Sequence, residues 1–272
     1  MLFKKYFLHH LGPCQKSNQN CELGLHPISY RVLITGKSFV QGSSTCVMLT
    51  FSFHGSEKHF LYDTGTSYDR EKLLTELKKC HLKTDDIDCV ILSHWHIDHI
   101  GNADLFPNAL IVTSAETFDV IQHIQKIQRS NENAGNEISK YYTNLLKLAS
   151  LSYTPSKIRA MTTLTQKHQN QFRFVVDAYA AHKVVLITDK TACFDNLICL
   201  YKLHSHTYGD IVIKILCDDR AILLTGDYII DKVDYSHHLD RLQQFDMHSH
   251  DLIIPGHDSY FSVETSSSEI LV

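Results

Sequence analysis

Four side chains that commonly bind metals stand within six residues of one another: His94, His96, Asp98 and His99. They follow an apolar run over 88–92, which is typical of a short buried strand. In extended backbone, side chains two residues apart point to the same side, so His94 and His96 can bind one ion together. If the chain then turns, Asp98 and His99 face a second ion nearby. Because four ligands leave two ions short of closed shells, further ligands must come from elsewhere in the fold.

Three later side chains can complete the two shells, and each follows an apolar run typical of a strand: His206, Asp227 and His257. Gly226 and Gly256 precede two of them, and glycine allows the tight turn that aims the next side chain. His204 is an alternative to His206, because it lies only two residues earlier. Nitrogen and carboxylate ligands suit zinc, although iron and manganese use the same residue types.

The composition is that of an ordinary globular chain of 272 residues, with 43% hydrophobic and 21% charged residues. A net charge of -4 offers no broad basic face for sequence-independent binding of nucleic acid. No run reaches the roughly 18 apolar residues of a membrane-spanning helix, and no signal peptide is recognised. The eight cysteines form no C-x-x-C pair, which favours a reducing compartment. We therefore expect a cytoplasmic protein, or one that is also nuclear.

The sequence predicts a flexible extension over residues 1–28 and one domain over residues 29–272. Short β-branched or aromatic runs indicate strands over 30–34, 45–51, 59–62, 88–92, 110–112, 184–187, 197–203, 211–216, 221–224 and 252–254. Apolar residues at helical spacing indicate helices over 71–79, 116–127 and around 141–146. Thr113 and Glu116 predict a capping box, and Asp218-Asp219 predicts a hairpin turn. The stretch around 150–195 has no other clean period and is interpreted as an insertion.

This arrangement resembles the metallo-β-lactamase superfamily, whose H-x-H-x-D-H motif matches residues 94–99. Its other motifs match Asp63-Thr64-Gly65, His206-Thr207-Tyr208-Gly209, Thr225-Gly226-Asp227 and Pro255-Gly256-His257. The resemblance implies a four-layer αβ/βα sandwich. It also implies two zinc ions per chain, held by His94, His96 and His206 and by Asp98, His99 and His257, with Asp227 bridging them. By the same resemblance, Asp63 orients the histidine loop; Ser205 stands where the family usually has glycine.

The resemblance implies hydrolysis by a metal-bound hydroxide, with Asp98 and Asp227 as the catalytic carboxylates that set the charge of the metal pair. Within the superfamily, residues 93–107 are most similar to a subfamily of endoribonucleases that cleave the 3′ ends of histone pre-mRNA. That RNA would then be the substrate.

Three alternatives remain open at this point. The same site in a glyoxalase II-like thioesterase or a lactonase would attack a small thioester or lactone. A persulfide dioxygenase would hold a single iron ion, and a binding protein would keep the ligands without catalysis. The sequence leaves the oligomeric state undetermined, a homodimer included.

Overall fold

Two β-sheets pack face to face in the computed structural model, which describes residues 11–12, 28–38, 42–130, 133–148, 153–189, 191–194, 198–217, 220–237 and 239–263. The predicted extension over 1–28 lies outside the described residues, apart from residues 11–12 and 28. The predicted hairpin turn at 218–219 also lies outside them.

The first sheet has the strand order β2-β3-β4-β5-β6-β7, in which β2 to β4 pair antiparallel and β4 to β7 pair parallel. Its strands are β2 (Ser29–Ile34), β3 (Cys46–Phe53), β4 (Ser56–Tyr62), β5 (Cys89–Ile91), β6 (Leu110–Ser114) and β7 (Val184–Ile187). The parallel strands are short and wholly or mostly buried, as is usual where helices cover one face and a second sheet covers the other.

The second sheet has the order β1-β8-β9-β10-β11-β12-β13, and only its β11–β12 pair is parallel. Its strands are β1 (Leu11–Gly12), β8 (Thr191–Phe194), β9 (Ile198–His204), β10 (Tyr208–Leu216), β11 (Ala221–Gly226), β12 (Leu252–Pro255) and β13 (Phe261–Ser262). All of the predicted strands are therefore present, with boundaries shifted by a few residues.

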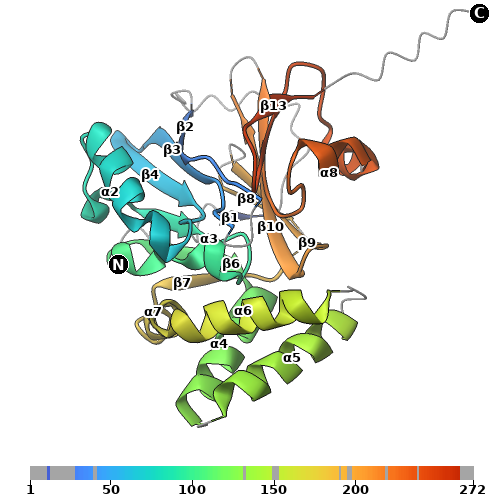
Figure 1. Ribbon diagram of the computed structural model, residues 1–272. Helices are drawn as coiled ribbons and strands as arrows, with labels where there is room; N and C mark the ends of the chain where they lie inside the picture. Colours follow the sequence, from blue (N-terminus) through green and yellow to red (C-terminus); the bar gives the residue numbers. More distant parts are fainter. Residues whose placement is uncertain are drawn as a thin grey trace, which may run out of the picture.

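Helices lie on the outer face of each sheet (Figure 1). On the side of the first sheet they are α2 (Arg70–Lys79), α3 (Ile97–Ile100), α4 (Ala115–Ser130), α5 (Ala134–Leu148), α6 (Pro155–Lys167) and α7 (Gln169–Ala180), with the short 3-10 helices η1 (Ser67–Asp69), η2 (Thr84–Asp86) and η3 (Ala103–Leu105). Of these, α5 packs against α4 and α6. On the second they are α8 (Lys232–His237) and η4 (Leu239–Phe245). Separate apolar clusters fill the space between the sheets and beneath each helical layer. The expected four-layer sandwich is confirmed.

The start of α4 differs from the predicted capping box. Thr113 belongs to β6, and its hydroxyl donates to the Leu92 carbonyl. The cap is instead Ser114, whose Oγ accepts from the Thr117 backbone N–H at 3.0 Å. Glu116 faces Lys202 in an ion pair of 2.7 Å rather than the helix N-terminus. The strand runs two residues further than its apolar pattern suggests, and the cap lies one residue later than predicted, at Ser114.

The stretch 150–195 contains two helices, α6 and α7, that the sequence analysis did not predict. Thr154 caps α6 by accepting from the Lys157 N–H, and Pro155 occupies the first turn, where its missing N–H costs nothing. α7 buries Phe172 and Val175 against the helices and strands of the first sheet. Among the described residues, no helix is long and apolar enough to cross a membrane.

Candidate metal centre

Strand ends bring the predicted ligands to one edge of the sandwich. β4 and β5 run parallel in one sheet, and β11 and β12 run parallel in the other, so each pair ends on the same side. Asp63 follows β4, and the histidine loop follows β5. Asp227 follows β11 and His257 follows β12. Loops at the carboxyl ends of parallel strands form a natural binding site, which explains why residues distant in sequence meet here.

The histidine loop changes from extended to helical conformation at His96, which has φ -64° and ψ 144° and precedes α3. His94 and His96 therefore lie on the extended part, with 2.9 Å between His94 Nε2 and His96 Nδ1. Asp98 and His99 lie in the first turn of α3, which carries them toward His257. The predicted change of direction between the two halves of the motif is thus observed.

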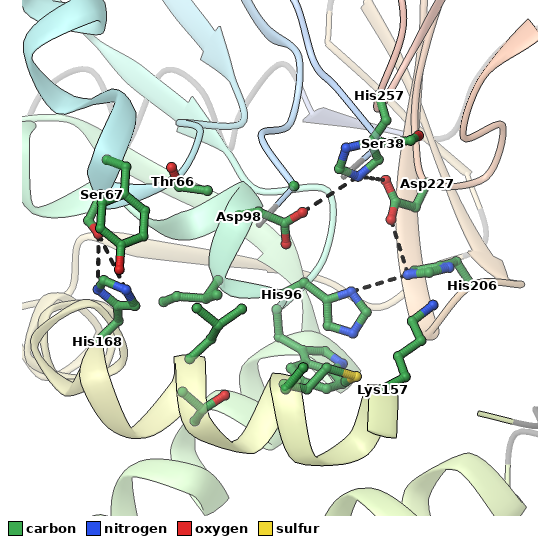
Figure 2. Close-up of a pocket in the computed structure, with 18 of the residues that line it drawn as sticks. Ser38, Thr66, Ser67, His96, Asp98, Lys157, His168, His206, Asp227 and His257 are labelled. Carbon is green, nitrogen blue, oxygen red and sulfur yellow. Dashed lines mark hydrogen bonds and ion pairs between the residues drawn. The ribbon is translucent and has the colours of Figure 1, made fainter. Parts of the chain in front are cut away.

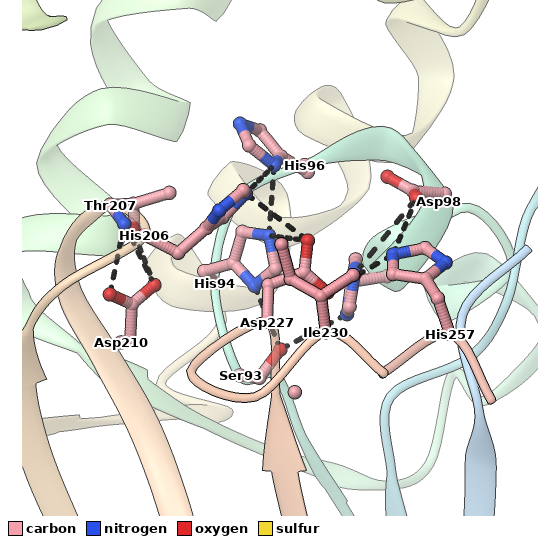
Figure 3. A network of polar contacts seen from close by, with 12 residues as sticks. Ser93, His94, His96, Asp98, His206, Thr207, Asp210, Asp227, Ile230 and His257 are labelled. Atoms are coloured by element: carbon pink, nitrogen blue, oxygen red, sulfur yellow. Dashed lines mark hydrogen bonds and ion pairs between the residues drawn. The ribbon is translucent and has the colours of Figure 1, made fainter. Parts of the chain in front are cut away.

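The seven predicted ligands form two neighbouring groups, and within each group the candidate ligand atoms lie within 4.8 Å of one another (Figure 3). The first group is His94, His96, His206 and Asp227, and the second is Asp98, His99 and His257. His204 is in neither group, because it remains at the end of β9 and stacks on Tyr208 with ring centroids 4.2 Å apart. Of the two alternatives left open by the sequence, only His206 faces the other ligands.

Asp227 lies between the two groups. Its Oδ2 is 3.1 Å from His206 Nε2 and 4.0 Å from His94 Nε2. Its Oδ1 is 3.1 Å from His99 Nε2 and 3.0 Å from His257 Nε2. One carboxylate thus presents an oxygen to each group, which is the arrangement required of a bridging ligand.

The charges of the site fit a pair of cations. Burial lowers the pKa of His94 and His96, and neighbouring imidazoles lower it further, so both rings are neutral and can donate a lone pair. Burial by itself would raise the pKa of Asp227, but the His99, His206 and His257 imidazoles hold it well below its usual range. His99 Nε2 and Asp227 Oδ1 are buried and face each other at 3.1 Å without forming a hydrogen bond. Buried polar atoms are normally satisfied, so these two atoms fit metal ligands better than a hydrogen-bonded pair.

Asp63 holds the histidine loop through three contacts. Its Oδ1 accepts from the Ser93 backbone N–H at 2.7 Å, and its Oδ2 accepts from Ser93 Oγ at 2.8 Å. Oδ2 is also 2.7 Å from His99 Nδ1, which directs His99 Nε2 toward the centre. Asp63 itself is fully buried and is not a member of either ligand group. This is the orienting position that the family resemblance implied for Asp63.

A second carboxylate, Asp210, shapes the turn that carries His206, and the sequence analysis did not identify it. Its Oδ1 accepts from Thr207 Oγ1 at 2.6 Å, and its Oδ2 accepts from Ser205 Oγ at 2.9 Å. The Ser205 hydroxyl thus has a structural role at the position where the family usually has glycine. An aspartate three residues after Thr207 was the available sequence signal for this turn, because Asp side chains in turns accept hydrogen bonds from nearby backbone N–H groups, here from Thr207.

Gly256 allows the Asp227 carboxylate to approach the loop that carries His257. A Cβ at Gly256 would overlap Asp227 Oδ1 and would lie 2.7 Å from the Gly226 carbonyl oxygen. We expect Gly256→Ala to displace Asp227 and to weaken metal binding by about 10- to 100-fold, the range seen when groups that position ligands are disturbed. Competition with a chromogenic zinc chelator measures the affinity. Gly135→Ala is the matched control, since a Cβ there meets only the flexible amide end of Gln166; equal affinities in the two variants would contradict this role.

A cavity of about 740 Å³ opens onto the two ligand groups (Figure 2). Its lining includes Trp95, Ile97 and Ile230 beside the metal ligands, and residues of η1 and α6 further away. Lys157 is the one lining residue, among those described, with a permanent positive charge. The lining residues on α6 and η1 could not be identified from the sequence, because neither helix was predicted.

The sequence similarities to known proteins cover only part of this chain. Residues 40–117 match the model of the metallo-beta-lactamase superfamily. Metallo-beta-lactamase domain-containing protein 1 is 43% identical in Homo sapiens and 41% in Rattus norvegicus, over 54 residues that make up 20% of this chain. That stretch is 20% and 22% of these relatives, so the chain spans about a fifth of their length.

Solved structures match most of the chain at low sequence identity. A Thermotoga maritima protein described as a metallo-beta-lactamase is 19% identical with a TM-score of 0.57, covering 88% of this chain and 100% of that one. The dizinc quorum-quenching lactonase AidC is 16% identical with a TM-score of 0.50, covering 89% and 92%. At these identities the likeness concerns the fold.

Proposed function

Because the chain belongs to the metallo-β-lactamase superfamily, we propose that this metal-dependent hydrolase holds two zinc ions and cleaves a small ester-type carbonyl compound, such as a thioester or a lactone. The observation that carries the proposal is the lining of the cavity. It is mainly apolar beside the His and Asp ligands, and Lys157 supplies its one permanent positive charge among the described residues. A neutral carbonyl group with an apolar substituent matches that lining.

The ligand set assigns a task to each group of residues. His94, His96 and His206 with Asp227 would hold one ion, and Asp98, His99 and His257 with Asp227 the other. Bound there, the two ions would lower the pKa of a bound water to about 7 and polarise the carbonyl oxygen of the substrate. The products are a carboxylate and an alcohol or thiol, which takes up a proton as the acyl bond breaks.

The chain's own residues position the reaction. Asp63 keeps His99 in one orientation, and Asp210 keeps the turn of His206 in place. Asp98 is partly exposed at the cavity, with its Oδ2 3.5 Å from His257 Nε2. It is therefore placed to accept or return a proton as the leaving group departs.

A second candidate is the endoribonuclease acting on histone pre-mRNA, and the partial similarity to metallo-beta-lactamase domain-containing protein 1 supports it. RNA binding normally depends on several Lys and Arg contacts to phosphates. The described lining of the cavity offers one such residue, which favours the carbonyl substrate.

The test is a parallel assay of the full chain, loaded with zinc, on an aryl ester, a thioester, a lactone and single-stranded RNA. We expect cleavage of at least one carbonyl substrate, loss of that activity with a chelator, and recovery when zinc is returned. RNA cleavage that depends on metal, without cleavage of any carbonyl substrate, would replace this proposal with the second candidate. Metal analysis belongs to the same experiment: two zinc ions per chain agree with hydrolysis, whereas one iron ion would indicate oxidation chemistry.

A further inference from the structure

One face of α6 lines the cavity along its length. The residues of that face recur at helical spacing: Ser156, Lys157, Ala160, Met161, Leu164 and Thr165. Figure 2 shows Lys157 near His206 at the metal end, whereas His168, at the end of the helix, lies next to Ser67. The cavity therefore runs parallel to the helix axis, away from the metal centre.

Contacts at both ends of α6 and with the neighbouring helix α5 hold α6 in place. At its start, Tyr153 Oη lies 3.4 Å from His206 Nε2. At its end, His168 Nδ1 lies 3.0 Å from Ser67 Oγ, on η1. Thr165 Oγ1 forms a hydrogen bond of 2.6 Å with the buried Tyr142 hydroxyl of α5. These contacts fix the position of α6 relative to the metal ligands.

The chemistry of this wall changes along the helix. Lys157 projects from the first turn near the metal ligands, with its Nζ 3.8 Å from the centre of the Tyr153 ring. Ala160, Met161 and Leu164 then form an apolar stretch, faced by Ile97 and Trp95 from the histidine loop. A cation followed by an apolar channel suits a molecule with an acyl group at the metal end and a hydrocarbon chain beyond it.

We propose that the substrate carries a straight aliphatic acyl chain of about eight carbons, which lies along α6 with its carbonyl at the metal centre. This inference rests on the proposed hydrolase function. Leu164 follows Lys157 by seven positions, a rise of about 10 Å at about 1.5 Å per residue. An extended chain advances roughly 1.2 Å per bond, so about eight carbons fill that length. Lys157 then lies beside the carboxylate that hydrolysis leaves on the acyl chain.

The first experiment compares p-nitrophenyl esters of 2 to 12 carbons on the zinc-loaded full chain. Each added methylene should raise kcat/KM about twofold to fourfold up to eight carbons, because each is transferred from water to an apolar wall. Ala160→Phe should shorten the preferred chain to about four carbons, and Leu164→Phe to about six. Thr163→Phe is the matched control, since Thr163 is exposed on the outer side of the same helix.

The second experiment measures binding without catalysis. Trp95 is the only tryptophan of the chain and lines the cavity, so its fluorescence reports on an occupant. Octanoate should change this fluorescence saturably, whereas acetate should not. Lys157→Gln should weaken octanoate binding at least tenfold, and Ala160→Phe should abolish it.

The outcomes separate the two proposals. Ester hydrolysis that is independent of chain length, or unchanged in Ala160→Phe, overturns the acyl-chain inference and leaves the hydrolase function standing. Octanoate binding that requires Lys157 and Ala160, in a chain that hydrolyses none of the esters, would support the cavity and contradict the proposed function. Absence of both binding and hydrolysis contradicts both.

Discussion

Asp227→Asn is expected to lower kcat/KM by about a thousandfold or more and to reduce the metal content from two ions per chain to one or fewer. Asp227 is the only described carboxylate with one oxygen near each ligand group, within 3.1 Å of His206 on one side and of His99 and His257 on the other. The amide keeps the shape but removes the negative charge and one of the two acceptor oxygens. Loss of about 4 kcal/mol of transition-state stabilisation corresponds to that thousandfold decrease.

Elemental analysis of the purified variant and steady-state kinetics on the best carbonyl substrate measure both effects. Asp258→Asn is the matched control, because Asp258 follows His257 directly and, among the described residues, accepts from the backbone N–H groups of Lys232 and Ser259 rather than from a ligand. A variant at Asp227 that retains two zinc ions and full activity would show that Asp227 does not bridge the ions.

Asp63→Ala is expected to lower the free energy of unfolding of the metal-free protein by about 3 to 5 kcal/mol. The substitution leaves the Ser93 N–H buried without an acceptor, which costs about 1 to 3 kcal/mol. It also removes the carboxylate from His99 Nδ1, which keeps only the Ser93 hydroxyl 3.2 Å away, and a hydrogen bond to a charged group contributes about 1.5 to 3 kcal/mol. Equilibrium unfolding in urea gives this value directly. It is a large part of the roughly 5 to 15 kcal/mol that stabilises a typical domain.

Asp63→Asn separates orientation from stability at the same position. The amide can still accept from the Ser93 N–H, but it offers an N–H where His99 Nδ1 needs an acceptor. His99 would then move its proton to Nε2 and lose the lone pair that faces Asp227. We expect a smaller loss of stability than in Asp63→Ala, together with about 10- to 100-fold weaker binding of one of the two ions. Unchanged affinity for both ions would contradict an orienting role for Asp63.

The strand ends and their ligands could be predicted because their signals are local. A buried strand shows as an apolar run, and the polar residue that follows it is visible directly, as at Asp227 and His257. The pairing of parallel strands then brings these positions together, which the sequence alone does not show. The choice between His204 and His206 depended on where β9 ends, and a boundary that differs by one or two residues decides it.

α6 was not predicted because its two faces meet different surroundings. Ile158 and Thr162 pack toward the helical layer, whereas Ala160 and Lys157 face the cavity. A helix between a core and a cavity lacks the single apolar stripe that marks an amphipathic helix. Thr154 followed by Pro155 was the remaining signal of a helix start, and it points to the residue where α6 begins.

The metal ligands and the helix that lines the cavity belong to different parts of the fold, and this affects how such a protein can evolve. The reactive ions would depend on side chains at strand ends, whereas the selectivity would depend on a helix that supplies none of those ligands. Substitutions at Ala160, Met161 or Leu164 would therefore change which substrates are accepted, while the metal ligands that support bond cleavage stay the same.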